Sequence, residues 1–382
     1  MSGMNRRQLI KLLSLAPLST LIACTPNEVR RSIVAGQNLS KGDVKKAITS
    51  QLPTTGIPQL DLLVRKQLED LADRLLKEWG DERVASQKEY VKYSDQYQSR
   101  AIINFESGEI RVETLDPKDS KTKLEQAIIS TLLTPEDPSK VDLLTDKEIA
   151  TNGEPFLHNL VLDHQGQPIR YAWRAQQYAK HLMQTAYQRD TYNKKPRHFV
   201  VFQMVKNHQT DSKNKYAAYV NENTQRFKVK RSLVYAIMEA ESSFNPYAIS
   251  HIPAYGLMQI VPSSAGRDAH QLIYGRDGTP TKDYLFIAKN NIQMGTGYLS
   301  ILNDRYLARV THAQSREYCV IAGYNTGSGN VLKAFDANRD AAFARINRMT
   351  PSQVYNQLVG NLPYEETRRY LQKVTQYQRK YS

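Results

Sequence analysis

Hydrophobic residues recur along this chain at spacings that predict helices in some segments and strands in others. Between residues 60 and 79 they fall three or four positions apart, the period of a helix with one buried face, and Gly80 follows as a stop signal. On both sides of "ESGE" apolar and polar residues alternate instead. This alternation predicts a β-hairpin over residues 101–112 with Ser107 and Gly108 at its turn.

The same patterns predict a first domain of mixed helices and strands. The segments 124–133 ("LEQAIISTLL") and 171–183 are typical of helices, and 198–205 ("HFVVFQMV") is typical of a strand. Residues 58–205 are therefore predicted to form an α+β domain. Its histidines show no metal-ligand spacing, and the chain has no Gly-rich nucleotide loop, so we expect neither a metal nor a cofactor.

A change of character after residue 205 marks a second domain. Residues 206–213 are charged and polar and are predicted to be a linker, whereas 214–382 reads as successive helices separated by Gly-containing loops. A length of 382 residues fits two domains. From this boundary we expect a fragment starting near residue 212 to fold alone and to keep any activity of the second domain.

The N-terminus has the pattern of an export signal. Residues 1–23 combine positive charges with a short apolar run, too short for an ordinary membrane-spanning helix. "RRQLIK" leaves a twin-arginine route open beside general secretion. Residues 24–57 are polar with scattered Pro and Gly and are predicted to be a tether.

The tetrapeptide "LIAC" resembles the bacterial lipobox, in which cleavage before the cysteine accompanies its acylation. The resemblance implies that Cys24 becomes a lipid-bearing N-terminus. Thr25, rather than Asp, follows it, which for this class of lipoprotein implies the outer membrane, facing the periplasm. Cys319 would then have no partner for a disulfide, and its apolar surroundings predict burial.

The charge of the chain bears on its partners. The formal net charge is +14, and removing residues 1–23 leaves +11. An exported basic protein suits an anionic partner, and nucleic acid is excluded outside the cytoplasm. Cell-wall polymer, anionic lipid headgroups and a merely solvated basic surface remain open. The sequence does not tell whether other cell-wall enzymes are partners.

Two glutamates stand close together in "AIMEAESSFNP". In a helix over residues 231–243, Glu241 falls on the stripe of Val234 and Ile237 and should be buried. Glu239 projects about 200° away and should face solvent, so the two cannot share a site. Burial raises the pKa of a carboxyl and suits it to donate a proton near neutral pH. The alternative is a structural Glu241 paired with an arginine.

The segment that begins at Glu241, "ESSFNPYAISHIPAYGLMQIVPSSAG", resembles the signature of the lytic transglycosylases, a lysozyme-like superfamily. Three more segments resemble family motifs in the family's order, namely "NNIQMGTGYL", "AGYNTGSGNV" and "LPYEETRRYLQKV". Tyr255, Thr326 and Ser328 depart from the commoner family residues, which affects the expected shape of the subsites. The resemblance implies a lysozyme-like second domain that cleaves peptidoglycan.

Position by position, the resemblance implies that Glu241 is both catalytic acid and catalytic base. Packing roles stay open for Met258 and Tyr324, whereas an amide within an apolar run favours function for Gln259. The residues that the resemblance implies for substrate binding are Ser242, Met258, Gln259, Tyr324, Asn325 and Glu366.

Ordinary glycosidases use two carboxyl groups, whereas substrate-assisted ones use a group of the sugar. This chain offers one convincing carboxyl, so we expect the 2-acetamido group of N-acetylmuramic acid to assist Glu241. The product would be a 1,6-anhydro sugar, formed without water. A hydrolytic muramidase on the same fold and a wall-binding lipoprotein without activity are the rival interpretations. Analysis of the fragments released from cell wall separates all three.

Overall fold

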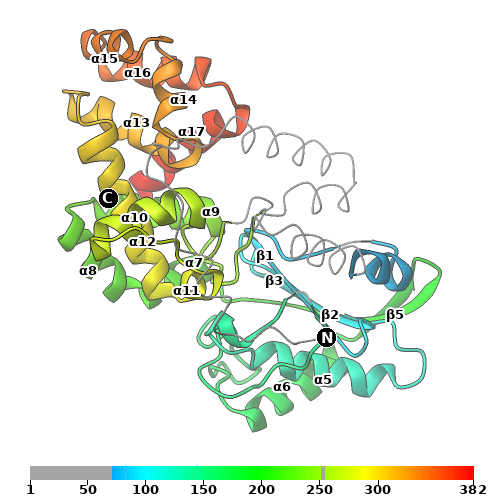
Figure 1. The fold of residues 1–382 in the computed structure, drawn as a ribbon. Helices are drawn as coiled ribbons and strands as arrows, with labels where there is room; N and C mark the ends of the chain where they lie inside the picture. The colour runs from blue at the N-terminus through cyan, green and yellow to red at the C-terminus, as the bar shows by residue number, and fades with distance from the viewer. Residues whose placement is uncertain (1–70, 82, 144, 251–253) are drawn as a thin grey trace, which may run out of the picture.

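The computed structural model describes residues 71–81, 83–143, 145–250 and 254–382. Figure 1 shows a domain built on a β-sheet beside a domain of helices. The predicted signal, lipidation site and tether lie outside the described residues, as does the first half of the helix expected from residue 60.

The first domain contains a five-stranded antiparallel sheet in the order β1-β2-β3-β5-β4. The expected hairpin is confirmed, because Ile103 pairs with Ile110 and Gly108 takes a left-handed φ of 77° at the turn. The strands are β1 (Glu89–Ser94), β2 (Ser99–Asn104), β3 (Glu109–Thr114), β4 (Gln188–Tyr192) and β5 (Lys195–Gln203).

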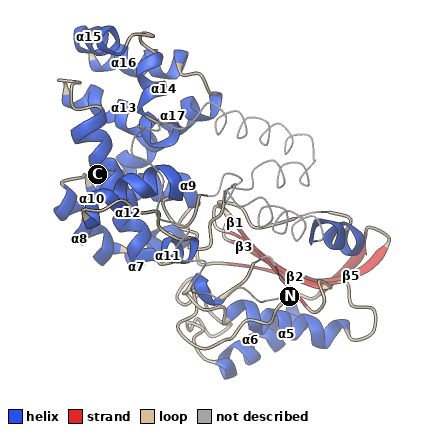
Figure 2. Cartoon of the chain, in the orientation of Figure 1, coloured by secondary structure: helices blue, strands red, loops and turns tan. Residues whose placement is uncertain are grey.

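Helices cover both faces of this sheet (Figure 2). On one face α5 (Ser120–Leu132) and α6 (Ala172–Thr185) pack together over the larger core, and the short 3-10 helix η2 (Pro138–Lys140) follows α5. On the other face a helix over residues 71–79 buries its apolar stripe against Val91 and neighbouring residues. The helices and the strand expected from periodicity are thus confirmed, and with them the α+β class.

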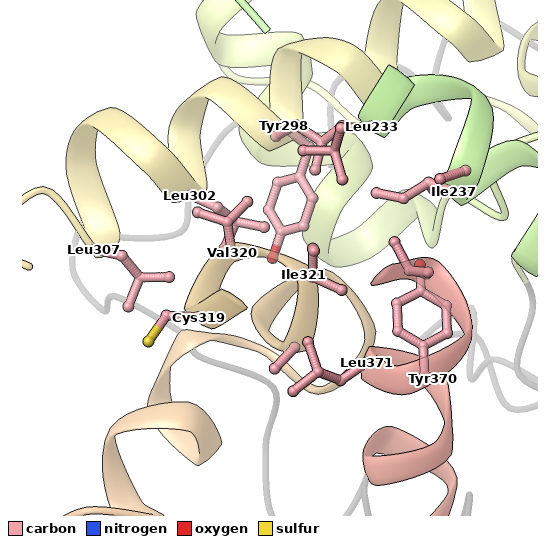
Figure 3. Packing of buried hydrophobic residues seen from close by; sticks show 14 of the residues in the cluster. Leu233, Ile237, Tyr298, Leu302, Leu307, Cys319, Val320, Ile321, Tyr370 and Leu371 are labelled. Atoms are coloured by element: carbon pink, nitrogen blue, oxygen red, sulfur yellow. The ribbon is translucent and has the colours of Figure 1, made fainter. Parts of the chain in front are cut away.

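The second domain consists mainly of helices in its described length. Its apolar core joins residues from distant segments, such as Ile237, Ile321 and Leu371 (Figure 3). The helices are α7 (His208–Lys215), α8 (Ala217–Phe227), α9 (Arg231–Ser242), α10 (Arg267–Tyr274), α11 (Lys282–Phe286), α12 (Ala288–Ile301), α13 (Ala313–Thr326), α14 (Ser328–Lys333), α15 (Arg339–Arg348), α16 (Pro351–Asn361) and α17 (Glu365–Lys380), with π-helical turns η3 (Pro262–Gly266) and η4 (Leu302–Tyr306). Among the described residues, none of the helices has both the length and the apolar character needed to cross a bilayer.

The segment expected to be a linker is largely helical. α7 occupies residues 208–215, and both of its ends contact the first domain. Nε2 of His208 lies 3.0 Å from the carbonyl oxygen of Phe105, and Nζ of Lys215 lies 3.2 Å from Oε2 of Glu136. The polar side chains that suggested a linker are therefore used in contacts between the domains.

The two domains also share a core contact. Tyr247, which follows α9, is fully buried in the core of the first domain, with its ring centroid 5.1 Å from that of Tyr90 and 5.2 Å from that of Phe156. Its hydroxyl donates a hydrogen bond to the carbonyl oxygen of Pro135. Asn245 adds a bond of 3.2 Å from Nδ2 to the carbonyl oxygen of Gln87. The domain boundary drawn from composition thus does not separate two independent cores.

Candidate active site

Helix α9 carries both glutamates and is buried on nearly all sides. It packs against α8 and α17, and nine of its twelve residues are buried. The helix ends in an unusual backbone, because Ser243 and Phe244 both have left-handed φ angles, of 50° and 64°. Two consecutive non-glycine residues in this region are uncommon and mark a constrained turn. Phe244, 1% exposed, holds the turn by packing into the core.

Glu241 lies in the last turn of α9, only 8% exposed, as its place on the apolar stripe predicts. Burial raises the pKa of its carboxyl to about 8. A hydrogen-bonding contact with Tyr370 and the positive charge of Lys373 both oppose this rise in pKa. The negative charge of Glu366 adds to it. The hydroxyl of Tyr370 nevertheless has no partner at standard hydrogen-bond geometry. Burial therefore favours the protonated form of Glu241 near neutral pH, and none of the arginines that the structure describes forms an ion pair with it.

Glu239 is buried as well, at 2% exposure, so the expectation that it faces solvent is wrong. The end of the chain covers it. Its carboxylate accepts a hydrogen bond of 2.6 Å from the hydroxyl of Tyr381 and one of 3.0 Å from Nζ of Lys380. The expected separation of the two acids is confirmed, because Glu239 and Glu241 contact different residues on different sides of the helix.

The loop of residues 254–261 carries Met258 and Gln259. Met258 is fully buried, its backbone N–H bonded at 2.8 Å to Oδ1 of Asn291, and its side chain packs against Gly295. Gln259 has a φ of 48° and is 8% exposed. Its Nε2 donates to the carbonyl oxygens of Ala248 and Gly256, both at 3.0 Å, while its Oε1 has no partner. Met258 is thus a core residue, and Gln259 keeps an unused acceptor.

Two hydroxyl groups fasten this loop to the helices around it. Ser242 is fully buried, and its Oγ lies 2.9 Å from the carbonyl oxygen of Met238 and 2.8 Å from that of Leu257. The hydroxyl of Tyr324 donates to the carbonyl oxygen of Met258 at 2.8 Å. Burial raises the pKa of Tyr324, and the charge of Glu241 adds to the rise. Both residues therefore tie the loop to the helices, and the expected role of Ser242 in substrate binding stays a prediction.

The remaining predicted residues lie around α17. Oδ1 of Asn325 accepts a hydrogen bond of 2.7 Å from Oγ1 of Thr367, which joins the end of α13 to α17. Glu366 is exposed on the first turn of α17. Tyr370 and Lys373, which the sequence analysis did not single out, follow Glu366 at helical spacing on the same face. That spacing within "LPYEETRRYLQKV" was the available signal for both residues.

Asn291 of α12 is a third residue that the sequence analysis missed. It is fully buried, and its Nδ2 donates to the carbonyl oxygens of Tyr255 at 2.7 Å and Leu285 at 2.8 Å. Together with its bond to Met258, it ties α12 to two backbone groups of the loop, in Tyr255 and Met258, and to one of α11, in Leu285. Its position in the quoted segment "NNIQMGTGYL" was the only hint of this role.

Other features of the described residues do not add a second reactive centre. They contain no cluster of three or more His, Cys, Asp or Glu side chains that could hold a metal ion. Cys319 is buried as expected, and burial raises the pKa of its thiol to about 12. Cavities of about 400 and 480 Å³ lie elsewhere, one against β1 and α5 and one beside α7, and Glu241 lines neither.

Comparisons with known proteins cover both domains. Residues 54–230 match the family model described as the N-terminal domain of membrane-bound lytic murein transglycosylase C, and residues 218–347 match the transglycosylase SLT domain. The chain is 45% identical over 306 residues to membrane-bound lytic murein transglycosylase C of Sodalis glossinidius and of Yersinia pestis, an alignment that spans 79% of this chain and 85% of each relative.

Solved structures similar to this chain include the 70 kDa soluble lytic transglycosylase of Escherichia coli. The match has 24% identity and a TM-score of 0.33, and it covers 43% of this chain and 23% of that one.

Proposed function

The chain belongs to the membrane-bound lytic murein transglycosylase C family, and we propose that Glu241 is the single acid and base with which it cleaves peptidoglycan. Membership makes it a lytic murein transglycosylase, a lyase that acts on peptidoglycan. The proposed bond is the β-1,4 linkage between N-acetylmuramic acid and N-acetylglucosamine. The observation that carries the assignment is the place of Glu241 on the buried face of α9, where burial raises the pKa of its carboxyl to about 8.

In the first half of the proposed reaction Glu241 protonates the glycosidic oxygen as the bond from that oxygen to C1 breaks. A raised pKa keeps the proton on Glu241 at neutral pH until the leaving oxygen takes it. The carbonyl oxygen of the 2-acetamido group on the same N-acetylmuramic acid stabilises C1 as positive charge develops there. The released chain leaves with a hydroxyl group on its N-acetylglucosamine.

In the second half the carboxylate of Glu241 removes the proton from the C6 hydroxyl of the N-acetylmuramic acid. The C6 oxygen then bonds to C1, and a 1,6-anhydro ring forms. Glu241 regains the proton that it gave up, so the enzyme returns to its starting state and no water is consumed. One carboxyl suffices because it acts first as an acid and then as a base.

The surrounding residues are proposed to divide between contact and support. Gln259, with its unused acceptor, Asn325 and the exposed Glu366 are the candidates for direct contact with the sugars. The hydrogen bonds described above favour supporting roles for the other three residues that were expected at the sugar subsites. These residues hold in place the loop that presents Gln259. These are Ser242, Met258 and Tyr324.

We further propose that the mature protein is anchored by lipid on Cys24 in the outer membrane and faces the periplasm, where peptidoglycan lies. The pattern of residues 1–24 and the membrane-bound naming of the relatives support this location. A Cys24→Ala variant should remain uncleaved or become soluble. Recovery of lipid-modified mature protein from that variant would refute the anchor.

The function is tested by digesting purified peptidoglycan with the full-length enzyme and weighing the released fragments by mass spectrometry. We expect ends lighter by one water than those of a hydrolase product. Glu241→Gln should lower the rate by about 10² to 10⁴ or more, because the amide neither donates nor accepts the proton. Fragments with reducing ends would instead identify a muramidase, and binding without release would identify a wall-binding protein.

A further inference from the structure

Lys373 belongs to α17, which packs against the helix that carries Glu241, and its side chain contacts the first domain. It lies on α17, three residues after Tyr370, and its charge acts on Glu241. On its other side its Nζ lies 3.6 Å from Oε1 of Glu106, in the turn between β2 and β3. The ammonium group of Lys373 therefore connects Glu241 of the second domain electrostatically with Glu106 of the first.

Glu106 also binds a second lysine. Nζ of Lys88, which precedes β1, donates to the same Oε1 of Glu106. The carboxylate thus lies between two ammonium groups that would otherwise face each other. Burial and the charge of Lys88 lower the pKa of Lys373, whereas the charge of Glu106 raises it. Glu106 accordingly helps to keep Lys373 both charged and in place.

The hairpin turn that carries Glu106 is fixed against the second domain. The carbonyl oxygen of Phe105, the preceding residue, is 3.0 Å from Nε2 of His208 in α7. Close by, Tyr247 is buried in the first domain's core, and the backbone N–H of Ile249 bonds to the carbonyl oxygen of Ser86 at 3.4 Å. The distance between Glu106 and Lys373 is therefore set by built contacts between the domains rather than by two free side chains.

Several charged or titratable groups face Glu241, and Lys373 is the cation among them. Glu366 and Tyr370 come from the same helix, and Tyr324 comes from α13. A carboxyl that must first donate and then accept a proton works best when its pKa lies near the working pH. Burial and Glu366 push that pKa upward, and a nearby ammonium group moderates the rise.

We propose that Lys373 is a positioning residue for the reaction, held beside Glu241 by Glu106, and that the first domain thereby takes part in catalysis. This inference rests on the proposed role of Glu241. It assigns to the first domain an electrostatic contribution to the chemistry.

The first test is the pH dependence of kcat/KM for the full-length Lys373→Met variant on soluble glycan strands. Methionine keeps much of the length of the side chain and removes the charge. Without the cation the carboxylate form of Glu241 is less stable, so Glu241 should stay protonated to higher pH. In the plot of kcat/KM against pH, the decline on the alkaline side (the alkaline limb) should therefore move to higher pH by about half a pH unit or more. Arg369→Gln, which removes an exposed cation from the same helix, is the matched control and should leave the limb unchanged.

The second test separates Glu106 from a merely structural contact. Glu106→Gln should move the alkaline limb in the same direction but less far, because Glu106 is 52% exposed and water screens it. Salt at about 1 M should reduce this shift. In the Lys373→Met background, Glu106→Gln should add nothing, because it acts through Lys373. Glu109→Gln, on an exposed residue of the same hairpin, is the control.

The outcomes separate this inference from the proposed function. If Glu241→Gln is inactive but Lys373→Met leaves the limb in place, the inference fails and the function stands. A downward shift, or a Glu106→Gln shift that persists without Lys373, also overturns it. If Glu241→Gln keeps near-normal turnover, the proposed function itself is wrong. Thermal unfolding accompanies each variant, and Lys373→Gln replaces the methionine variant if the latter does not fold.

Discussion

At the scale of single residues, the two glutamates of α9 show that burial alone does not make an acid reactive. Glu239 is the more buried of the two, yet two donors, from Lys380 and Tyr381, satisfy its carboxylate. Glu241 has no partner of this kind and faces a second carboxylate, Glu366. What distinguishes the candidate catalytic residue is therefore that Tyr370 and Lys373 only partly offset the effect of burial, so its pKa stays raised.

The pairing of Glu239 predicts a stability effect. Glu239→Gln leaves Lys380 without its counter-charge and should lower the free energy of unfolding by about 1 to 3 kcal/mol. Activity of the folded variant should change by less than about tenfold, because Glu239 does not face the reacting centre. Urea unfolding and fragment release measure the two effects. A variant as stable as the parent would show that the contact contributes nothing.

The raised pKa of Glu241 predicts how stability changes with pH. In the unfolded chain this group titrates near 4.5, whereas in the folded protein it holds its proton up to about pH 8. Between these values the unfolded state loses a proton that the folded state keeps, so stability falls as pH rises. Glu241→Gln has no such dependence. Its free energy of unfolding should equal that of the parent near pH 4 and should exceed it by a growing amount up to pH 8. Denaturant unfolding across that pH range measures this difference. Parallel curves would refute the raised pKa.

At the scale of elements, the loop after α9 depends on a helix far along the chain. Asn291 of α12 bonds to the backbone N–H of Met258 and the carbonyl oxygen of Tyr255 in this loop, and also to the carbonyl oxygen of Leu285 in α11. Asn291→Ala would leave these buried groups unpaired and should cost about 2 to 5 kcal/mol. The loop also presents Gln259, so turnover should fall with stability. Full activity in a folded Asn291→Ala variant would show that the loop holds without this side chain.

Local patterns predicted the elements well where local forces decide them. The hairpin around Gly108 and helices α5, α6 and α9 were predicted because alternation and helical periodicity reflect which face each element buries. The exposure of Glu239 was predicted wrongly, because the end of α17 covers the second face of α9 and this cannot be read from the period of α9 alone. The helix in the expected linker was missed for a similar reason, since its contacts come from the other domain.

The candidate site divides in the same way. Glu241 could be predicted from the helical stripe and the family motif together, whereas for Lys373 the spacing on α17 was a signal but its contact with Glu106 was not, because Glu106 lies in another domain. Ser242 and Met258 were identified as functional positions, yet the contact partners that give them supporting roles depend on how the loop folds back. A motif identifies positions that matter, and only the three-dimensional packing tells whether they touch substrate.

At the scale of the whole molecule, the shared contacts predict that the domains depend on each other. A fragment of residues 206–382 keeps every helix from α7 onward but exposes Tyr247 and leaves Asn245 without its partner. We expect it to be less stable than the same domain in the full chain and prone to associate through Tyr247. Differential scanning calorimetry and sedimentation test this. A monomeric fragment as stable as the full-length domain would restore the boundary drawn from composition.

The insertion of Tyr247 has a consequence for the order in which the protein matures. The first domain is synthesised ahead of residue 247, so for a time its core lacks the aromatic ring that packs against both Tyr90 and Phe156. That domain completes its packing only when the catalytic helix and the turn after it have also arrived. A chain truncated or stalled before this point would present an incompletely packed core to proteases. Resistance of the first domain to proteolysis therefore depends on residues of the second domain. Chains that survive proteolysis would be those that also contain the catalytic helix.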